Sequence, residues 1–368
     1  GGGGDPSAFF GLYALSAAAM PGALSALSGE AGTATQQAAF NASGLFLSMM
    51  LDPMTGARGA TAASASPSLV QMADPPMRGR AVAVDAGWTV WTKAYAQSGR
   101  TSGDAAVGSA STSGSLYGAA AGADRRLTPD TLVGFALSGG GSSFGLGQAR
   151  GSGSGDTFQA GLYGSTRLGD GYVSAALAYG WNSFSVSRNV AVAGLNETYA
   201  TRVTAHTFGG RLETGRRFAI GVSGLTPYAA LEAIGYTAPA YAETFAAPAT
   251  GAFALAYGGR TSASVRTELG LRADAGMDLA PGRRLIAYGR LAWAYQAKPE
   301  RSIDAAFQGL ANSGFTVFGA RASMHTALAT VGTELQIAAG TRLSSSVDVE
   351  LGDRHRSVRA NLGLRHSW

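Results

Sequence analysis

The last eight residues, Asn361-Leu-Gly-Leu-Arg-His-Ser-Trp368, alternate apolar and polar side chains and end on an aromatic residue. Successive side chains of a β-strand point to opposite faces. One face of this stretch therefore carries both leucines, His366 and Trp368, and the other carries Asn361, Gly363 and Arg365. Such a strand can present one face to lipid and the other to a water-filled interior. The alternative is a soluble edge strand that happens to end in tryptophan.

The composition favours a membrane barrel over a soluble protein of the same length. Of 368 residues, 54 are glycine and only 14% are charged, against about a quarter in an average soluble domain. The mean hydropathy is nevertheless only +0.07, as expected when lipid-facing and water-facing residues alternate. No stretch reaches the ~18 consecutive apolar residues of a membrane helix, so any spanning must be done by strands.

The charge pattern and the residue types exclude several classes of function. The chain has no cysteine, and hence no disulfide framework and no thiol chemistry. Its net charge is +5, but the basic residues are spread singly and form no cluster with interleaved aromatics, so we expect no nucleic-acid partner. The four histidines are scattered along the chain, and we therefore expect neither a metal nor another cofactor.

Three regions differ in composition and periodicity. Residues 1–51 are alanine-rich with helical spacing, residues 52–87 form a linker rich in proline, serine, alanine and glycine, and residues 88–368 have the period of two that is typical of strands. The chain begins with four glycines, without a methionine or a charged, apolar leader. We therefore expect it to be a processed or excised C-terminal piece of a longer protein.

Two helices are predicted ahead of the strands. The longer one covers residues 34–51 and ends at Asp52-Pro53, because the residue before a proline disfavours helix. A shorter one lies upstream and ends at Pro21-Gly22. The longer helix would measure about 27 Å, close to the ~25 Å apolar band of a barrel. Either this helix or the linker could occupy a barrel lumen. Packing outside the barrel or at the membrane surface is the other interpretation, because the helix is more apolar than a plug in a polar lumen should be.

Residues 88–368 are predicted to form a transmembrane barrel of twelve antiparallel strands. The links alternate between short turns and long loops, as in outer-membrane barrels with short periplasmic turns and long external loops. Long links are expected at 187–200, 239–259 and 298–319, whereas the short link at 352–355 breaks the alternation. The predicted strands are 88–97, 114–126, 131–143, 154–168, 171–186, 201–214, 225–238, 260–275, 283–297, 320–337, 342–351 and 356–368.

Most charged residues of the predicted strands fall on a single face, which we assign to the lumen. An arginine that faces lipid near the midplane costs about 2–4 kcal/mol, so these charges are expected to point inward. They would line a polar conduit and form salt bridges between strands. The assigned residues are Arg167, Arg211, Glu232, Arg266, Glu268, Arg272, Arg290, Glu334, Arg342, Asp348, Glu350, Arg359 and Arg365.

A C-terminal twelve-stranded barrel that follows a helix and a linker resembles the translocator, or β-domain, of type V secreted autotransporters. The stretches Leu27-Ser-Gly-Glu30, Gln36-Gln-Ala-Ala-Phe40 and Leu51-Asp-Pro53 are similar to the segment that precedes such barrels. The last strand resembles the C-terminal assembly signal of outer-membrane proteins. Its signal positions are Asn361, Gly363, His366 and Trp368, and His366 departs from the pattern because that position is usually apolar.

The resemblance implies an outer-membrane translocator and anchor of a Gram-negative bacterium. It would let an N-terminal passenger, which is absent from these residues, reach the cell surface, and it would not be an enzyme itself. The implied partners are the barrel-assembly machinery, periplasmic chaperones, the lipid and lipopolysaccharide of the outer membrane, and the barrel's own passenger. We expect the barrel to be a monomer.

Two other classes of function compete with this interpretation. A diffusion porin would have the same wall around an open lumen, but it has no use for a helix and a linker ahead of the barrel. An outer-membrane hydrolase would need a catalytic cluster at the outer rim. Gly141-Ser-Ser-Phe-Gly145 matches the nucleophile pattern G-x-S-x-G, but that pattern requires a strand-turn-helix setting. We therefore expect no catalysis at Ser143.

Overall fold

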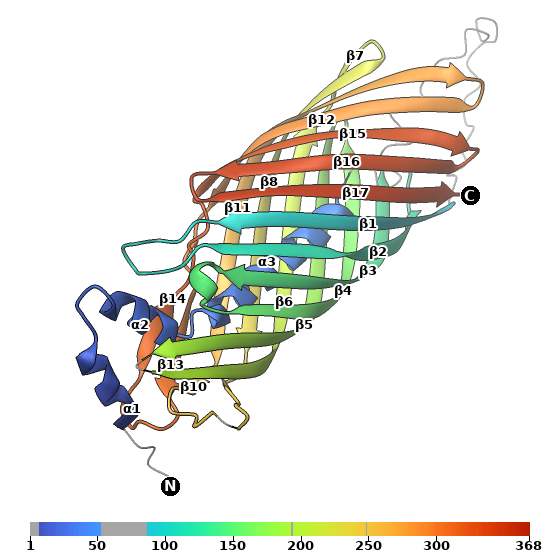
Figure 1. Cartoon of the computed structure of the whole chain (residues 1–368). Helices are drawn as coiled ribbons and strands as arrows, with labels where there is room; N and C mark the ends of the chain where they lie inside the picture. The colour runs from blue at the N-terminus through green and yellow to red at the C-terminus, as the bar shows by residue number, and fades with distance from the viewer. Residues whose placement is uncertain (1–6, 53–86, 193, 248) are drawn as a thin grey trace, which may run out of the picture.

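The computed structural model describes residues 7–52, 87–192, 194–247 and 249–368. Twelve antiparallel strands form a closed ring, in which β1 pairs with both β2 and β17, and β8 pairs with both β6 and β11 (Figure 1). The predicted twelve-stranded antiparallel barrel is confirmed. The ring strands are β1 (Trp88–Thr101), β2 (Thr112–Arg126), β3 (Thr131–Leu146), β4 (Ser152–Leu168), β5 (Gly171–Val192), β6 (Leu195–Arg216), β8 (Ser223–Ala238), β11 (Arg260–Ala280), β12 (Arg283–Gln296), β15 (His325–Ala338), β16 (Thr341–Gly352) and β17 (His355–Ser367).

Side chains alternate between the two faces of the wall, as the period of two predicts. In β17 the side chains of Leu362 and Leu364 are exposed on the outside, whereas Gly363 and Arg365 are buried on the inside. Trp368 follows on the outer face and is 62% exposed. A continuous exposed apolar surface of this kind is the lipid-facing band of a membrane barrel.

The two ends of the ring differ in their connections. At one end, short turns join the strands at 127–130, 169–170, 281–282 and 339–340, and β1 begins and β17 ends there. We call this end the turn mouth; it also carries β7 (Phe218–Ile220), which pairs with β8. The opposite end has most of the long connections, and we call it the loop mouth.

At the loop mouth, two long connections build a second, four-stranded sheet. Its strands are β9 (Tyr241–Ala242), β10 (Leu255–Tyr257), β13 (Ser302–Phe307) and β14 (Phe315–Phe318), in the order β14-β13-β10-β9. The β3–β4 connection at the same mouth contains the short helix η2 (Gly147–Ala149). The long connections predicted at 239–259 and 298–319 are therefore folded structures.

The long loop predicted over residues 187–200 is wrong. β5 continues to Val192 and β6 starts at Leu195, with Gly194 at φ +83° in the turn between them. Val190, Val192 and Tyr199 are buried in this extension beneath N-terminal residues of the chain. Packing of the N-terminal segment therefore keeps the two strands extended where the sequence suggested a loop.

The described residues 7–52 form four helical elements: α1 (Ser7–Phe10), η1 (Gly11–Ala14), α2 (Met20–Leu27) and α3 (Ala31–Met50). The prediction that Pro21-Gly22 ends a helix is wrong, because Pro21 lies in the first turn of α2. Proline is tolerated there, since the first turn has no hydrogen-bond partner for its N–H. Helix α3 begins at Ala31 instead of residue 34 and ends at Met50 instead of residue 51.

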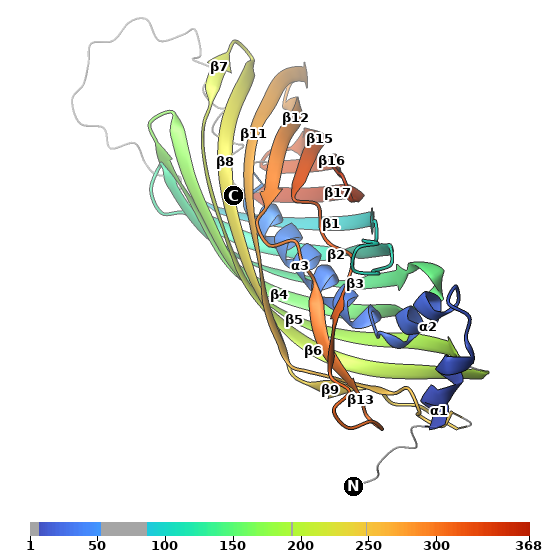
Figure 2. The same cartoon turned by 90° about the vertical axis from the view of Figure 1, so that its left-hand side faces the viewer.

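Helix α3 runs inside the barrel, whereas α1 and α2 lie at the loop mouth, far from the C-terminus (Figures 1 and 2). Within the described residues, no helix is both long and apolar enough to cross a membrane. Most of the predicted linker, residues 53–86, lies outside the described residues. The sequence left open whether this helix or the linker occupies the lumen, or whether the helix packs outside the barrel. In the structure the helix lies in the lumen (Figures 1 and 2).

Candidate functional site

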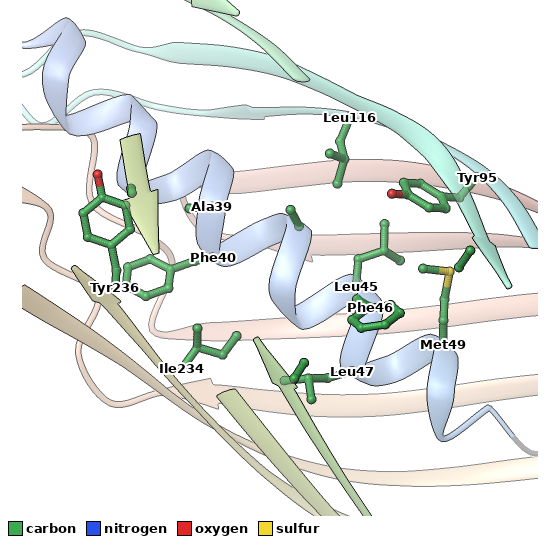
Figure 3. Close-up of a cluster of buried hydrophobic side chains, with 14 of the residues drawn as sticks. Ala39, Phe40, Leu45, Phe46, Leu47, Met49, Tyr95, Leu116, Ile234 and Tyr236 are labelled. Carbon is green, nitrogen blue, oxygen red and sulfur yellow. The ribbon is translucent and has the colours of Figure 1, made fainter. Parts of the chain in front are cut away.

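One side of α3 packs against an apolar part of the lumen wall. Figure 3 shows its side chains between Ile234 and Tyr236 on one side and Tyr95 and Leu116 on the other. The rings of Phe40 and Tyr236 have their centroids 6.0 Å apart. All of these side chains belong to one buried cluster, which joins α3 to strands of the wall.

Small side chains make room for this helix. The buried, inward-facing alanines are Ala120, Ala136, Ala176, Ala178 and Ala205, on β2, β3, β5 and β6. A helix with its side chains is about 10–12 Å across, and a wall of larger residues would exclude it. We call this part of the lumen the alanine wall. It explains why α3 can be more apolar than a plug in a uniformly polar lumen should be.

Buried hydrogen bonds fix the position of α3 along the barrel. The hydroxyl oxygens of Ser43 and Thr207 are 2.8 Å apart. The Nε2 of Gln36 donates to the carbonyl oxygen of Ser302, also at 2.8 Å. Because a buried polar group that loses its partner costs about 1–3 kcal/mol, a shift of the helix by one residue would break several favourable contacts at once.

Ionic contacts hold both ends of α3. Next to its first residue, the Glu30 carboxylate accepts a hydrogen bond from the Ala110 N–H at 2.7 Å and pairs with Arg150 at 3.3 Å. Burial raises the pKa of the Glu30 carboxyl above its usual value, and the contacts with Ala110 and Arg150 oppose that shift. Beyond the last turn, Asp52 Oδ2 lies 2.6 Å from Lys93 Nζ. The helix is therefore held at the loop mouth by Glu30 and inside the lumen, on β1, by Asp52.

The remaining side of α3 carries a polar stripe. Gln37, Asn41, Gly44 and Ser48 follow one another at spacings of four, three and four residues, and all are only partly buried. They line a cavity of about 140 Å³ between the helix and the opposite wall. A larger cavity of about 740 Å³ continues past Ser48 toward the turn mouth. The space that α3 leaves in the lumen is therefore lined by many polar and charged side chains.

A connected network of ion pairs covers the wall opposite the stripe. Arg211 lies at its centre, with its guanidinium 3.3 Å from Glu213, 3.6 Å from Glu232 and 3.2 Å from Glu268. From Glu268 the network continues through Arg290 at 3.2 Å to other strands. Arg272–Glu213 (2.7 Å), Arg290–Asp348 (3.3 Å) and Arg359–Asp348 (3.1 Å) extend this network. Arg266–Glu350 (2.9 Å) and Arg342–Glu334 (2.6 Å) are separate pairs on the inner face.

The structure places the residues that we assigned to the lumen on the inner side of the wall, with Arg167 exposed at the rim of the turn mouth. Asp348 and Arg359, which are Cα partners on β16 and β17, form one of the expected salt bridges between strands. Arg342 binds Glu334, and its Cα partner on β17 is Arg365, a buried arginine. Like charges in register were not anticipated from the sequence.

Glu213 and Lys93 are among the charged residues of the lumen that were not assigned from the sequence. Glu213 was not assigned, although it alternates in phase with Arg211 on β6 and could have been found from that parity. Lys93 was missed because its neighbours Trp91 and Tyr95 made the inner face of β1 look apolar.

The features associated with catalysis or metals do not assemble into a site. Ser143 is exposed on β3, with its hydroxyl 2.8 Å from that of Ser115. Its strand setting lacks the turn and helix of a nucleophile elbow. Among the residues that the structure describes, no group of three or more histidine, aspartate or glutamate side chains could hold a metal ion.

Comparison with known proteins gives a consistent answer. A family model described as the autotransporter beta-domain matches residues 90–348. The structure is similar to the translocator domain of the autotransporter NalP from Neisseria meningitidis, with a TM-score of 0.59 at 14% identity, over 77% of this chain and 88% of that one. It is also similar to the beta domain of the Bordetella autotransporter BrkA, with a TM-score of 0.52 at 20% identity, over 77% of this chain and 100% of that one. No curated protein sequence matches the chain.

Proposed function

The chain belongs to the autotransporter β-domain family, and we propose that α3 is the segment by which the exported part of the chain stays attached to the barrel. As a member of this family, the barrel is a non-enzymatic translocator of the Gram-negative outer membrane that exports a passenger. Because such barrels have short periplasmic turns and long external loops, the turn mouth faces the periplasm and the loop mouth faces the outside.

The position and direction of α3 in the lumen support this proposal. The helix begins beside Glu30 at the loop mouth, and Asp52, which follows it, pairs with Lys93 on the inner face of β1, part of the way to the turn mouth. The described residues ahead of Glu30 therefore lie outside, whereas β1 starts at the periplasmic end of the barrel. A passenger joined to this segment would be held on the cell surface by a helix enclosed in the barrel.

The same helix argues against the porin alternative. A diffusion porin needs an open lumen, whereas α3 packs against the alanine wall and leaves beside it a cavity of about 140 Å³, with a larger one of about 740 Å³ toward the turn mouth. We propose that the charged residues of the opposite wall line the conduit. Because most of these charges already pair with one another, they would not bind a passing unfolded chain tightly.

A reporter fused ahead of Gly1 tests the direction of export. If the N-terminal segment reaches the outside, protease added to intact cells will remove the reporter while a soluble periplasmic marker stays whole. A variant that lacks β17 provides the matched control, because its ring cannot close and its reporter should stay protected. Protection of the reporter on a fully inserted barrel would contradict the proposal.

We further propose that β17 is the address read by the barrel-assembly machinery, after periplasmic chaperones have delivered the unfolded chain. His366 and Trp368 stack on the outer face with ring centroids 5.5 Å apart, where outer-membrane lipid and lipopolysaccharide would surround them. On the inner face, Asn361 donates to Asp348 at 2.8 Å, and a Cβ added at Gly363 would lie 2.7 Å from Ser344 Oγ.

Deleting Ser367 and Trp368 should lower the amount of inserted barrel in cells several-fold. The deletion removes the outer aromatic residue and the bond from the Trp368 N–H to the Trp88 carbonyl oxygen (3.1 Å). The amount of heat-modifiable barrel in outer-membrane fractions measures the effect. Refolding of the purified variant in detergent separates a lost signal from lost stability: normal refolding with poor insertion is expected, and normal insertion in cells would contradict the proposal.

A further inference from the structure

The residues directly ahead of α3 are packed into the loop mouth. The ring of Phe9 meets Phe253 and Phe307 nearly edge-on, with centroid distances of 5.2 and 4.9 Å. Leu27 of α2 is only 4% exposed and lies in a cluster with Tyr199 and other residues of the β5–β6 extension. Apolar side chains of the N-terminal segment thus complete a core whose other half belongs to the barrel.

A buried ion pair of the barrel reaches the backbone of this segment. Arg188 on β5 binds Glu243 through two nitrogens, at 2.9 and 2.5 Å, and the two residues are 2% and 5% exposed. The same guanidinium donates to the carbonyl oxygen of Ala26 at 3.1 Å and to that of Phe253 at 2.9 Å. Glu243 also accepts hydrogen bonds from the backbone of β10 and from Tyr257. The carbonyl of Ala26, near the end of α2, is thereby tied to the barrel.

The turn between α2 and α3 is fitted closely to the same surface. Gly29 has φ +70°, and a Cβ added there would lie 2.4 Å from Tyr257 Oη and 2.5 Å from Leu255 Cδ1. Any other residue at this position would meet both a strained backbone and a steric clash. One residue later, Glu30 binds Ala110 and Arg150 from two other connections of the barrel.

We propose that the loop mouth contains a docking site for residues 26–30, and that docking there fixes the point at which outward movement of the chain stops. The inference rests on the proposed function, because only an exported segment can reach this mouth through the lumen. With residues 26–30 docked, the 20 residues of α3, about 30 Å long, remain inside the lumen. Gly29 makes the site specific for this segment of the chain, since only glycine fits the turn between α2 and α3.

Cysteine labelling tests the docking, because the chain contains no cysteine of its own. In otherwise unchanged barrels, Leu27→Cys and Ala39→Cys should both resist a membrane-impermeant maleimide, since Leu27 is 4% and Ala39 is 0% exposed. Adding Gly29→Ala should accelerate labelling at position 27 about tenfold, the effect expected from strain at one left-handed residue, and leave position 39 protected. Gly22→Ala is the matched control, because among the described residues no atom lies within 4 Å of a Cβ placed there.

A disulfide tests the stop point itself. Ser43 and Thr207 have their hydroxyl oxygens 2.8 Å apart, so Ser43→Cys with Thr207→Cys should cross-link in cells when α3 stops in the observed register. Gly29→Ala should lower the yield of this cross-link several-fold, and Gly22→Ala should not change it. If Gly29→Ala barrels lose their heat-modifiable form, Arg188→Gln replaces them, because it removes the bond to Ala26 from the barrel side.

The possible outcomes distinguish failure of the docking site from failure of the proposed function. Rapid labelling of Leu27→Cys in a barrel that keeps Gly29 would overturn the docking site. Faster labelling at position 27 with an unchanged cross-link would overturn its role in stopping the chain. Rapid labelling at position 39 in the parent barrel would instead contradict the enclosed helix, and with it the proposed function.

Discussion

Replacing Arg211 by methionine is expected to lower the free energy of unfolding of the barrel by about 3–5 kcal/mol, the usual cost of removing one partner from a buried ionic cluster. Arg211 is 6% exposed and faces Glu213, Glu232 and Glu268, which are also buried. Without the guanidinium, three carboxylates would remain close together in a site that water reaches poorly.

Urea titration in detergent micelles, followed by tryptophan fluorescence and heat modifiability, measures this loss. Arg202→Met is the matched control, because Arg202 lies on the same strand with its side chain exposed on the outer face. Adding Glu268→Gln to Arg211→Met should recover part of the stability, since one uncompensated charge is removed. Equal unfolding midpoints for Arg211→Met and Arg202→Met would show that the network does not stabilise the wall.

Deleting the chain up to Met50 is expected to raise the single-channel conductance of the barrel in planar bilayers about tenfold. The deleted helix, about 10–12 Å across with its side chains, fills the space beside the alanine wall, and its removal would leave a water-filled passage. The charged wall does not depend on the helix for most of its ion pairs, so the barrel should still insert.

A shorter deletion that ends before Glu30 is the control for this experiment. It removes α1 and α2 but leaves α3 in the lumen, and its conductance should stay close to that of the parent barrel. A large, steady conductance in the parent that neither deletion changes would favour the diffusion porin. If the shorter deletion already raises the conductance as much as the longer one, the main obstruction lies at the loop mouth.

The wall of the barrel could be predicted because its causes are local. Lipid on one side and water on the other impose a period of two, and short turns with glycine mark the ends of strands. The prediction failed at residues 187–200, where packing against Leu27 and other N-terminal residues keeps the strands extended. It also failed at Pro21, because proline either ends a helix or begins one, and only the fold decides which.

The sequence predicts which face of each strand carries the lumen charges, but it does not predict which charges pair with each other. The cost of a charge in lipid assigns Arg272 to the inside, yet its partner Glu213 lies on β6, beyond the intervening strand β8. The length of the side chains and the stagger of the strands decide such pairs, and neither is visible in one sequence. The pair of Arg188 and Glu243 was missed for a related reason, since Glu243 lies in a connection that was predicted to be a loop.

The attachment of residues 26–30 to the loop mouth also has a mechanical consequence. A passenger dragged by fluid flow or by adhesion to a surface would pull on the chain from outside. That tension would reach the contacts of Ala26 and Glu30 before it reached α3, and Arg188 would pass it into β5. β5 and β6 pair along 22 residues each, so the load would be shared by the longest hairpin of the barrel, and the helix would remain unstretched.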